Sequence, residues 1–472
     1  MQIEFYSWGA AQEVTGSKHF LHIDDTILMI DCGAFQGKRE IADKKNREWD
    51  FDPSKIDALI LTHAHYDHSG LIPLLVKRGF KGNIYATPAT RDLAGLILTD
   101  SAHIQKSDIE YLKKHNQDDN IVIKEPLYTD DDVQKAMSSI ISIPYHRPFP
   151  VAPGITLTFI DAGHILGSSQ ALIEIEKDGQ KSRIGFTGDL GRKNLPILRD
   201  PDILPDPDFL FIESTYGNRL HDTVDFATDK LADIISRTTA RGGKIIIPAF
   251  SIERTQELVY IIHLLTDQKK IPNIPIYVDS PMATNATSIF SAHPECFDEE
   301  TRENFLIHNK NPFGFNQLHY VQDREESKEL NKLREPAIII SASGMCESGR
   351  ILHHLRNNIE DHRNTILIVG FMAENTLGRK IADRQKTVRI LGGEHKLNAE
   401  VKILNAFSAH ADYNEILDYL SSFDPNKLKK IYMVHGEPEA QEFLKLKLIE
   451  KNFKTTIMEP GKKYIENHTC PK

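Results

Sequence analysis

The stretch His63-Ala64-His65-Tyr66-Asp67-His68 decides the fold of this chain. It follows the apolar run at residues 58–61, which predicts a short buried strand, and it precedes a helix expected to begin near Ser69. Imidazoles and carboxylates are ligands that zinc prefers, and a tight turn at a strand end lets them converge. The pattern predicts two metal positions, with His63 and His65 facing one ion and with Asp67 and His68 pointing towards the other. A solvated histidine-rich loop is the alternative, but it does not explain this order at the mouth of a buried strand.

Length and composition describe an ordinary globular enzyme. The chain has 472 residues, of which 40% are hydrophobic and 8% aromatic, and such a length favours about two or three domains. No run approaches the roughly 18 apolar residues of a membrane span, and the first residues are typical of a strand rather than of a signal peptide. Together with four widely spaced cysteines, which predict neither a disulfide framework nor a thiolate zinc site, these features favour a cytoplasmic protein. The net charge of −10 argues weakly against a protein coated in nucleic acid, although a local basic groove is compatible with it.

Further along the chain, three polar side chains each lie at the end of a predicted strand: His164, Asp189 and Glu213. Each of them alone is more often a structural residue or a turn residue than a ligand. With the first cluster they supply enough ligands for two ions, and a carboxylate such as Asp189 is able to bridge both charges.

These residues resemble the five motifs of the metallo-β-lactamase fold. The motifs appear here as Asp31, the cluster of residues 63–68, His164, Asp189 and a late histidine, His435. The resemblance implies an αββα sandwich with a two-zinc site at the edge of the paired sheets. It assigns one zinc to His63, His65, His164 and Asp189, and the other to Asp67, His68, Asp189 and His435. Asp31 would orient ligands by hydrogen bonding. Iron or manganese is the alternative to zinc, because sites without thiolate are only moderately selective.

The middle of the chain alternates strands and helices regularly, which predicts a parallel sheet with crossover helices. This domain interrupts the first one, because the late histidine lies beyond it. We therefore predict three parts: residues 1–212 and 393–472 form the metal-binding domain, and residues 213–392 form the insertion.

The inserted region resembles the β-CASP domain. The markers are Glu213-Ser214-Thr215-Tyr216-Gly217, Pro248-Ala249-Phe250-Ser251, Asp279-Ser280-Pro281-Met282-Ala283, Ser343-Gly344-Met345-Cys346, Phe407-Ser408-x-His410-x-Asp412 and Val434-His435-Gly436-Glu437. The fold class is thus α/β, a metallo-β-lactamase sandwich with a β-CASP insertion. The nearest resemblance is to bacterial β-CASP ribonucleases that are related to the endonuclease subunit of the cleavage and polyadenylation machinery.

The resemblance implies a zinc-dependent ribonuclease that hydrolyses phosphodiester bonds of single-stranded RNA. Two zinc ions would activate a hydroxide, and Asp67 would orient it. His410, hydrogen-bonded to Glu213, would lie beside the scissile phosphate and protonate the departing ribose oxygen. Endonuclease action is favoured, and 5′-to-3′ exonuclease action is the alternative with the same site residues.

Contacts to substrate phosphates are expected from Ser343, Gly344, Arg350 and Ser408. The turn at Ser343 and Gly344 follows a predicted strand and precedes a helix, so its N–H groups could cradle a phosphate. Basic residues also outnumber acidic ones between Arg350 and Arg389. A plain strand-to-helix turn with a solvated basic face is the alternative interpretation.

Two other classes of protein compete with the ribonuclease. A hydrolase of a small thioester or lactam would use the same metal core, although it needs no large insertion. A non-catalytic RNA-binding subunit would be a relative that has lost its ligands, whereas every ligand position is filled here. A homodimer is compatible with the sequence, but nothing in the sequence requires one.

Overall fold

The computed structural model describes residues 2–115, 124–177, 179–221, 224–304, 311–370, 372–373, 375–404 and 408–467. They form two compact units. The first consists of Met1–Lys193, Asp200–Leu220 and Ala409–Lys472, and the second of Asn194–Arg199 and His221–Ser408. Phe407 of the β-CASP markers and Cys470 lie outside the described residues.

The first unit contains two seven-stranded sheets. One has the order β22 (Tyr464–Asn467), β1 (Gln2–Gly9), β2 (Lys18–Ile23), β3 (Thr26–Ile30), β4 (Ala58–Ile60), β5 (Asn83–Ala86), β6 (Ile140–Ser142). The other has the order β21 (Thr455–Ile457), β20 (Lys430–Val434), β11 (Phe209–Glu213), β10 (Gln180–Phe186), β9 (Ser169–Lys177), β8 (Ile155–Asp161), β7 (Phe149–Ala152). Buried apolar side chains of both sheets, such as Phe5, Leu157 and Phe211, form one core between them.

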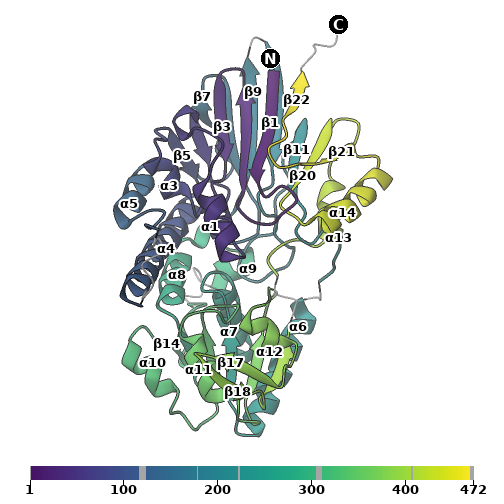
Figure 1. The fold of residues 1–472 in the computed structure, drawn as a ribbon. Helices are drawn as coiled ribbons and strands as arrows, with labels where there is room; N and C mark the ends of the chain where they lie inside the picture. The colour runs from purple at the N-terminus through teal and green to yellow at the C-terminus, as the bar shows by residue number, and fades with distance from the viewer. Residues whose placement is uncertain are drawn as a thin grey trace. The chain divides into compact units, whose positions relative to one another are not determined.

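Helices cover the outer faces of both sheets (Figure 1). The helices beside the first sheet are α1 (Arg39–Arg47), α3 (Ile72–Lys77), α4 (Pro88–His115) and α5 (Asp130–Ser138). The short helix α2 (Tyr66–Ser69) contacts α4. Beside the second sheet lie α13 (Tyr413–Leu420) and α14 (Pro438–Glu450), whose apolar residues pack in a second core with Leu210 and Ile212 of β11. The predicted αββα sandwich is confirmed.

Parallel strands explain why the expected ligands meet. The strands β3, β4 and β5 run parallel to one another, and so do β10, β11 and β20. The carboxyl ends of parallel strands lie at one edge of a sheet, so side chains that follow them are delivered to one place. The late strand β20 pairs with β11 although more than two hundred residues separate them in the chain.

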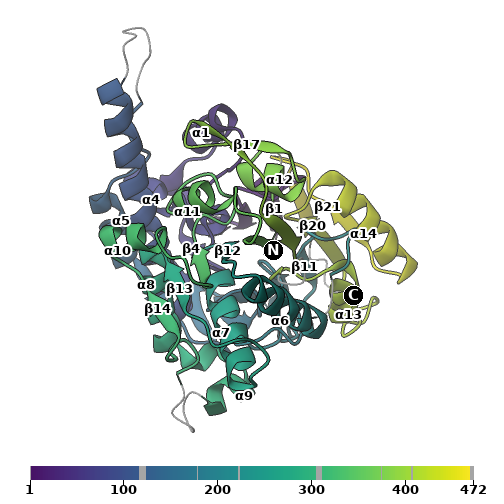
Figure 2. The same ribbon diagram turned by 90° about the horizontal axis from the view of Figure 1, so that it is seen from below.

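The second unit has a six-stranded sheet in which all strands are parallel. Its order is β14 (Leu318–Tyr320), β13 (Ile276–Asp279), β15 (Ile338–Ser341), β12 (Ile245–Pro248), β16 (Thr365–Ile368), β19 (Glu400–Ile403), and β17 (Thr387–Ile390) pairs separately with β18 (Gly393–Lys396). Figure 2 shows α11 (Ile351–Asn358) and α12 (Leu377–Ala382) on one face and α6 (Val224–Ala240) and α7 (Arg254–Asp267) on the other. The remaining helices are α8 (Pro281–Ala292), α9 (Glu299–Arg302) and α10 (Arg324–Leu330). The predicted parallel sheet with crossover helices is confirmed.

The limits of the inserted unit differ from the predicted 213 and 392. The segment after β11 stays with the first unit, because Tyr216 forms a β-bridge with Asp412. The strands β18 and β19 belong to the second unit, because they pair with β17 and β16. The insertion of the structure therefore runs from His221 to Ser408.

Within the described residues, no helix combines the length and the apolar character that a membrane span needs.

Candidate metal centre

Three histidines and Asp189 form a first group of ligand atoms at the carboxyl edge of the sheets. His65 Nδ1 lies 3.2 Å from His63 Nε2 and 3.2 Å from His164 Nε2. Asp189 Oδ2 lies 3.4 Å from His63 Nε2 and 3.6 Å from His164 Nε2. All four ligand atoms are within 4.8 Å of one another. The family resemblance assigns these four residues to one ion, and the structure brings them together.

A second group consists of Asp67, His68 and His435, with the other oxygen of Asp189 beside it. His68 Nε2 lies 3.2 Å from His435 Nε2 and 3.3 Å from Asp189 Oδ1. Asp67 Oδ2 lies 3.5 Å from His435 Nε2. The helix α2 begins at Tyr66, earlier than the start near Ser69 that the sequence predicts, and this first turn carries Asp67 and His68.

The spacing of these atoms fits metal ligation. Two nitrogens that each lie about 2.0–2.1 Å from a tetrahedral zinc are roughly 3.3 Å apart, close to the observed contacts between imidazole nitrogens. Asp189 Oδ1 is a buried polar atom with no hydrogen-bond partner among the described residues. A buried carboxylate oxygen without a donor is unfavourable unless a cation compensates its charge. The residues present therefore fit metal ions.

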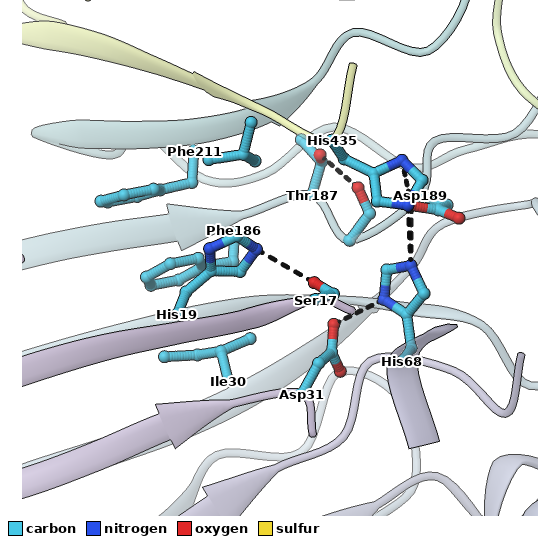
Figure 3. A pocket seen from close by; sticks show the side chains of 12 residues that line it. Ser17, His19, Ile30, Asp31, His68, Phe186, Thr187, Asp189, Phe211 and His435 are labelled. Carbon is cyan, nitrogen blue, oxygen red and sulfur yellow. Dashed lines mark hydrogen bonds and ion pairs between the residues drawn. The ribbon is translucent and has the colours of Figure 1, made fainter. Parts of the chain in front are cut away.

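Asp31 holds one histidine of each group in place. Its Oδ2 accepts a hydrogen bond of 2.7 Å from His68 Nδ1, which leaves His68 Nε2 free for a metal. The same carboxylate accepts from the Thr62 hydroxyl, and that hydroxyl lies 3.1 Å from His63 Nδ1. Figure 3 shows Asp31, His68, Asp189 and His435 on one side of a small cavity, with Phe186 and Phe211 on the other.

Charges within the site favour a cation. Burial lowers the pKa of His63 and His164, and it lowers that of His65 to about 4, so that these imidazoles are neutral as ligation requires. Burial alone would raise the pKa of Asp189, but His435 and His68 outweigh it and hold the pKa well below its ordinary value. For His68 the opposite holds, because Asp189 and Asp31 outweigh burial and raise its pKa. The carboxylates that hold a proton on His68 would equally attract a metal ion.

His410 and Glu213 form a pair beside the first group. His410 Nδ1 lies 3.1 Å from both carboxylate oxygens of Glu213 and 3.9 Å from Asp189 Oδ2. Burial disfavours the charged imidazole, but the two carboxylates outweigh it and raise the pKa of His410 to about 9. The backbone N–H of Leu190 also donates to Glu213 Oε1, so the carboxylate is held from two directions. Glu213 therefore fixes the orientation of the His410 ring, with Nδ1 facing the Glu213 carboxylate.

Comparison with known proteins places this arrangement in a family. Residues 19–232 match the model of the metallo-beta-lactamase superfamily, residues 255–381 that of the Beta-Casp domain, and residues 394–458 that of the Zn-dependent metallo-hydrolase RNA specificity domain. Ribonuclease TTHA0252 of Thermus thermophilus is 37% identical over 432 residues, which are 92% of this chain and 93% of that protein. The chain belongs to the β-CASP family of metallo-hydrolases.

One further relative and one solved structure are similar to this chain. Transcription termination factor FttA of Methanocaldococcus jannaschii is 34% identical to the β-CASP chain over 440 residues, which are 91% of this chain and 66% of that protein. A crystal structure of a protein of unknown function from Enterococcus faecalis superimposes with a TM-score of 0.55 at 12% identity, covering 99% of this chain and 100% of that one. At this identity the likeness concerns the fold alone.

The expected phosphate contacts of the β-CASP chain all lie in the second unit. The Ser343 hydroxyl accepts from the N–H groups of Glu347 and Ser348 in its own turn. Arg350 donates to Asp279 at 2.7 Å and to two backbone carbonyls, so its guanidinium is already engaged. Ser408 is half-buried at the end of the unit.

Sequence reasoning missed several residues that hold the ligands of the β-CASP site. Thr62 links Asp31 to His63, and Thr215 Oγ1 lies 3.0 Å from His435 Nδ1. A Cβ on Gly33 would lie 1.5 Å from the Asp67 carbonyl oxygen, so only glycine fits there. Thr62 directly precedes His63, and Gly33 follows Asp31 by two residues. Their closeness in sequence to the ligand motifs is the feature that could have identified them.

Proposed function

We propose that this chain is a zinc-dependent ribonuclease that holds two ions and cleaves phosphodiester bonds within single-stranded RNA. The observation that carries the proposal is the position of Asp189, whose two oxygens belong to two different ligand groups. The name of the Thermus relative and the family models support RNA as the substrate. The name of the family model that matches residues 394–458 supports zinc, and imidazoles and carboxylates are among its usual ligands.

When bound, the two ions would supply a water of lowered pKa and positive charge against the scissile phosphate. Asp67 has the most exposed carboxylate of the two ligand groups, with 20% of its side chain accessible against 1% for Asp189. It is therefore placed to orient the attacking water and to accept a proton from it, in addition to holding the second ion.

His410 would supply the proton that the departing ribose oxygen needs, since an alkoxide is a poor leaving group. Its side chain is 20% exposed, and Nδ1 is held by Glu213, so the Nε2 end of the ring is the one available to substrate. Ser343, Gly344 and Ser408 remain the phosphate-binding candidates of this proposal. Arg350 would support their turn through Asp279.

Replacing Asp67 with alanine should lower the rate of RNA cleavage at least ~10²-fold relative to the wild type. The reason is that this one residue would both bind the second ion and orient the attacking water. The assay is incubation of zinc-loaded protein with single-stranded RNA labelled at its 3′ end, and products are sized over time. Asp131→Ala, at an exposed carboxylate of α5, is the control and should cleave like the wild type.

The pattern of products separates the alternatives. Internal fragments that disappear in Asp67→Ala support an endonuclease, and shortening only from the 5′ end would make the protein an exonuclease. Intact RNA with the wild-type protein, together with hydrolysis of a glutathione thioester or a lactam, would replace the ribonuclease with a small-molecule hydrolase. Protein that binds RNA but retains no metal would indicate a binding subunit.

A further inference from the structure

The loop between β1 and β2, residues 10–17, contacts the backbone of two ligands of the second group. The Ser17 N–H donates to the Asp67 carbonyl at 2.8 Å, and the Ala10 carbonyl accepts from the His435 N–H at 2.7 Å. Asp67 and His435 come from opposite ends of the sequence, and this loop joins them. Among the hydrogen bonds of the described residues, none connects the loop to the three histidines of the first group.

The backbone of this loop is strained. Ala10 and Gln12 have φ angles of 50° and 59°, in the left-handed region that side chains disfavour. Its two ends touch, because a Cβ on Gly9 would lie 2.0 Å from the Gly16 carbonyl oxygen, and the Ala10 N–H donates to the Thr15 carbonyl at 3.0 Å. Such a backbone persists only where its surroundings hold it in place.

Lys18 is the side chain that holds it. Its ammonium is fully buried and donates to the Gly16 carbonyl at 3.1 Å and to the Gly33 carbonyl. Gly33 in turn donates its N–H to the Ser17 carbonyl at 2.9 Å. The ammonium also lies 4.6 Å from the centre of the Phe35 ring. One cation therefore joins the end of the loop to the glycine against which Asp67 packs.

A buried lysine of this kind is unfavourable for stability alone. No carboxylate among the described residues forms an ion pair with it, and burial lowers its pKa to about 8. Removing an ammonium from water is expensive, and carbonyl groups with aromatic rings compensate it only in part. Lys18 contacts Gly33, and Gly33 packs against the Asp67 backbone, so the buried ammonium supports the ligand cluster.

We propose that Lys18 is a positioning residue for the second metal position: it fixes the β1–β2 loop and Gly33, and thereby the backbone of Asp67 and His435. No hydrogen bond among the described residues connects the loop or Lys18 to His63, His65 or His164 of the first group. The inference rests on the proposed two-ion function, and it predicts unequal sensitivity of the two positions to a single substitution that touches no ligand.

The test is the zinc binding of Lys18→Met, which keeps the length of the side chain and removes its donors. Metal-free wild type and variant are titrated with zinc by calorimetry, and bound zinc is counted by mass spectrometry after dialysis. We expect the affinity of one of the two binding steps to fall on the order of 10–100-fold, the usual effect of losing a residue that supports a ligand, with a much smaller change at the other step. Lys244→Met, at the other largely buried lysine among the described residues and in the second unit, is the matched control and should bind zinc like the wild type.

Circular dichroism of the metal-free proteins shows whether the variant is folded. If Lys18→Met is not recovered in folded form, Lys18→Gln keeps one donor, and the same selective loss at one step is expected. An equal fall of both zinc affinities would show that Lys18 has a general structural role. Two unchanged affinities would show that Lys18 does not support zinc binding. Either result overturns the inference. Wild-type protein that binds a single ion would instead contradict the two-ion function, and the inference would fall with it.

Discussion

Asp189→Asn is expected to lower zinc affinity at both positions and to reduce RNA cleavage by ~10³-fold or more. The carboxylate offers Oδ2 to the first ligand group and Oδ1 to the second, so one substitution removes an anionic ligand from each. Metal charge at a phosphate is worth several kcal/mol, and each ~1.4 kcal/mol is a factor of ten in rate. Asparagine has nearly the same volume, so the buried cluster should keep its packing.

The measurement is zinc content per chain, followed by the cleavage assay at saturating zinc. Asp279→Asn is the matched control for metal content, because Asp279 is equally buried but lies in the second unit. If Asp189→Asn retained two zinc ions with wild-type affinity, Asp189 would not be the residue shared by the two positions.

His410→Ala is expected to leave both ions bound and to lower turnover about 10²–10⁴-fold, the usual contribution of a general acid. His410 lies outside the groups of His63 and His68; it forms a third cluster with Asp189 and Glu213, in which Glu213 already holds its Nδ1 at 3.1 Å. Its loss should therefore affect proton transfer and not metal affinity. Glu213→Gln should act in the same direction, because an amide stabilises the charged imidazole less than a carboxylate does.

A modified substrate isolates this role. An RNA with sulfur in place of the departing ribose oxygen needs no proton for departure, so the difference between wild type and His410→Ala should shrink on it. A His410→Ala protein that has lost its metal, or one with full activity on ordinary RNA, would contradict the assignment.

The candidate ligands could be located in the sequence because they follow the ends of predicted strands, and their grouping followed from the family resemblance. His63, Asp189 and His435 each follow an apolar run, and the sheet topology delivers such positions to one edge. The first predicted group has the same residues as one observed cluster, the second predicted group adds Asp189 to Asp67, His68 and His435, and a third cluster joins Asp189 to Glu213 and His410.

Contacts that depend on pairing between distant segments could not be predicted. Ser17 contacts Asp67, and Thr215 contacts His435, only once distant segments have packed together. A serine or a threonine by itself does not indicate in the sequence which residue it will contact. Arg350 illustrates the reverse case. Its charge favours a phosphate, but the buried carboxylate of Asp279 engages it, and local charge patterns contain no information on such a partner.

The pairing of β20 with β11 has a consequence for how the protein is made. His435 reaches the site only on β20, which leaves the ribosome after the entire inserted unit. Until then the second ligand group lacks its last imidazole, and β11 lacks the neighbour that orders its carboxyl end. Under the proposed function, a nascent chain can therefore cut RNA only after the whole inserted unit and β20 have been synthesised.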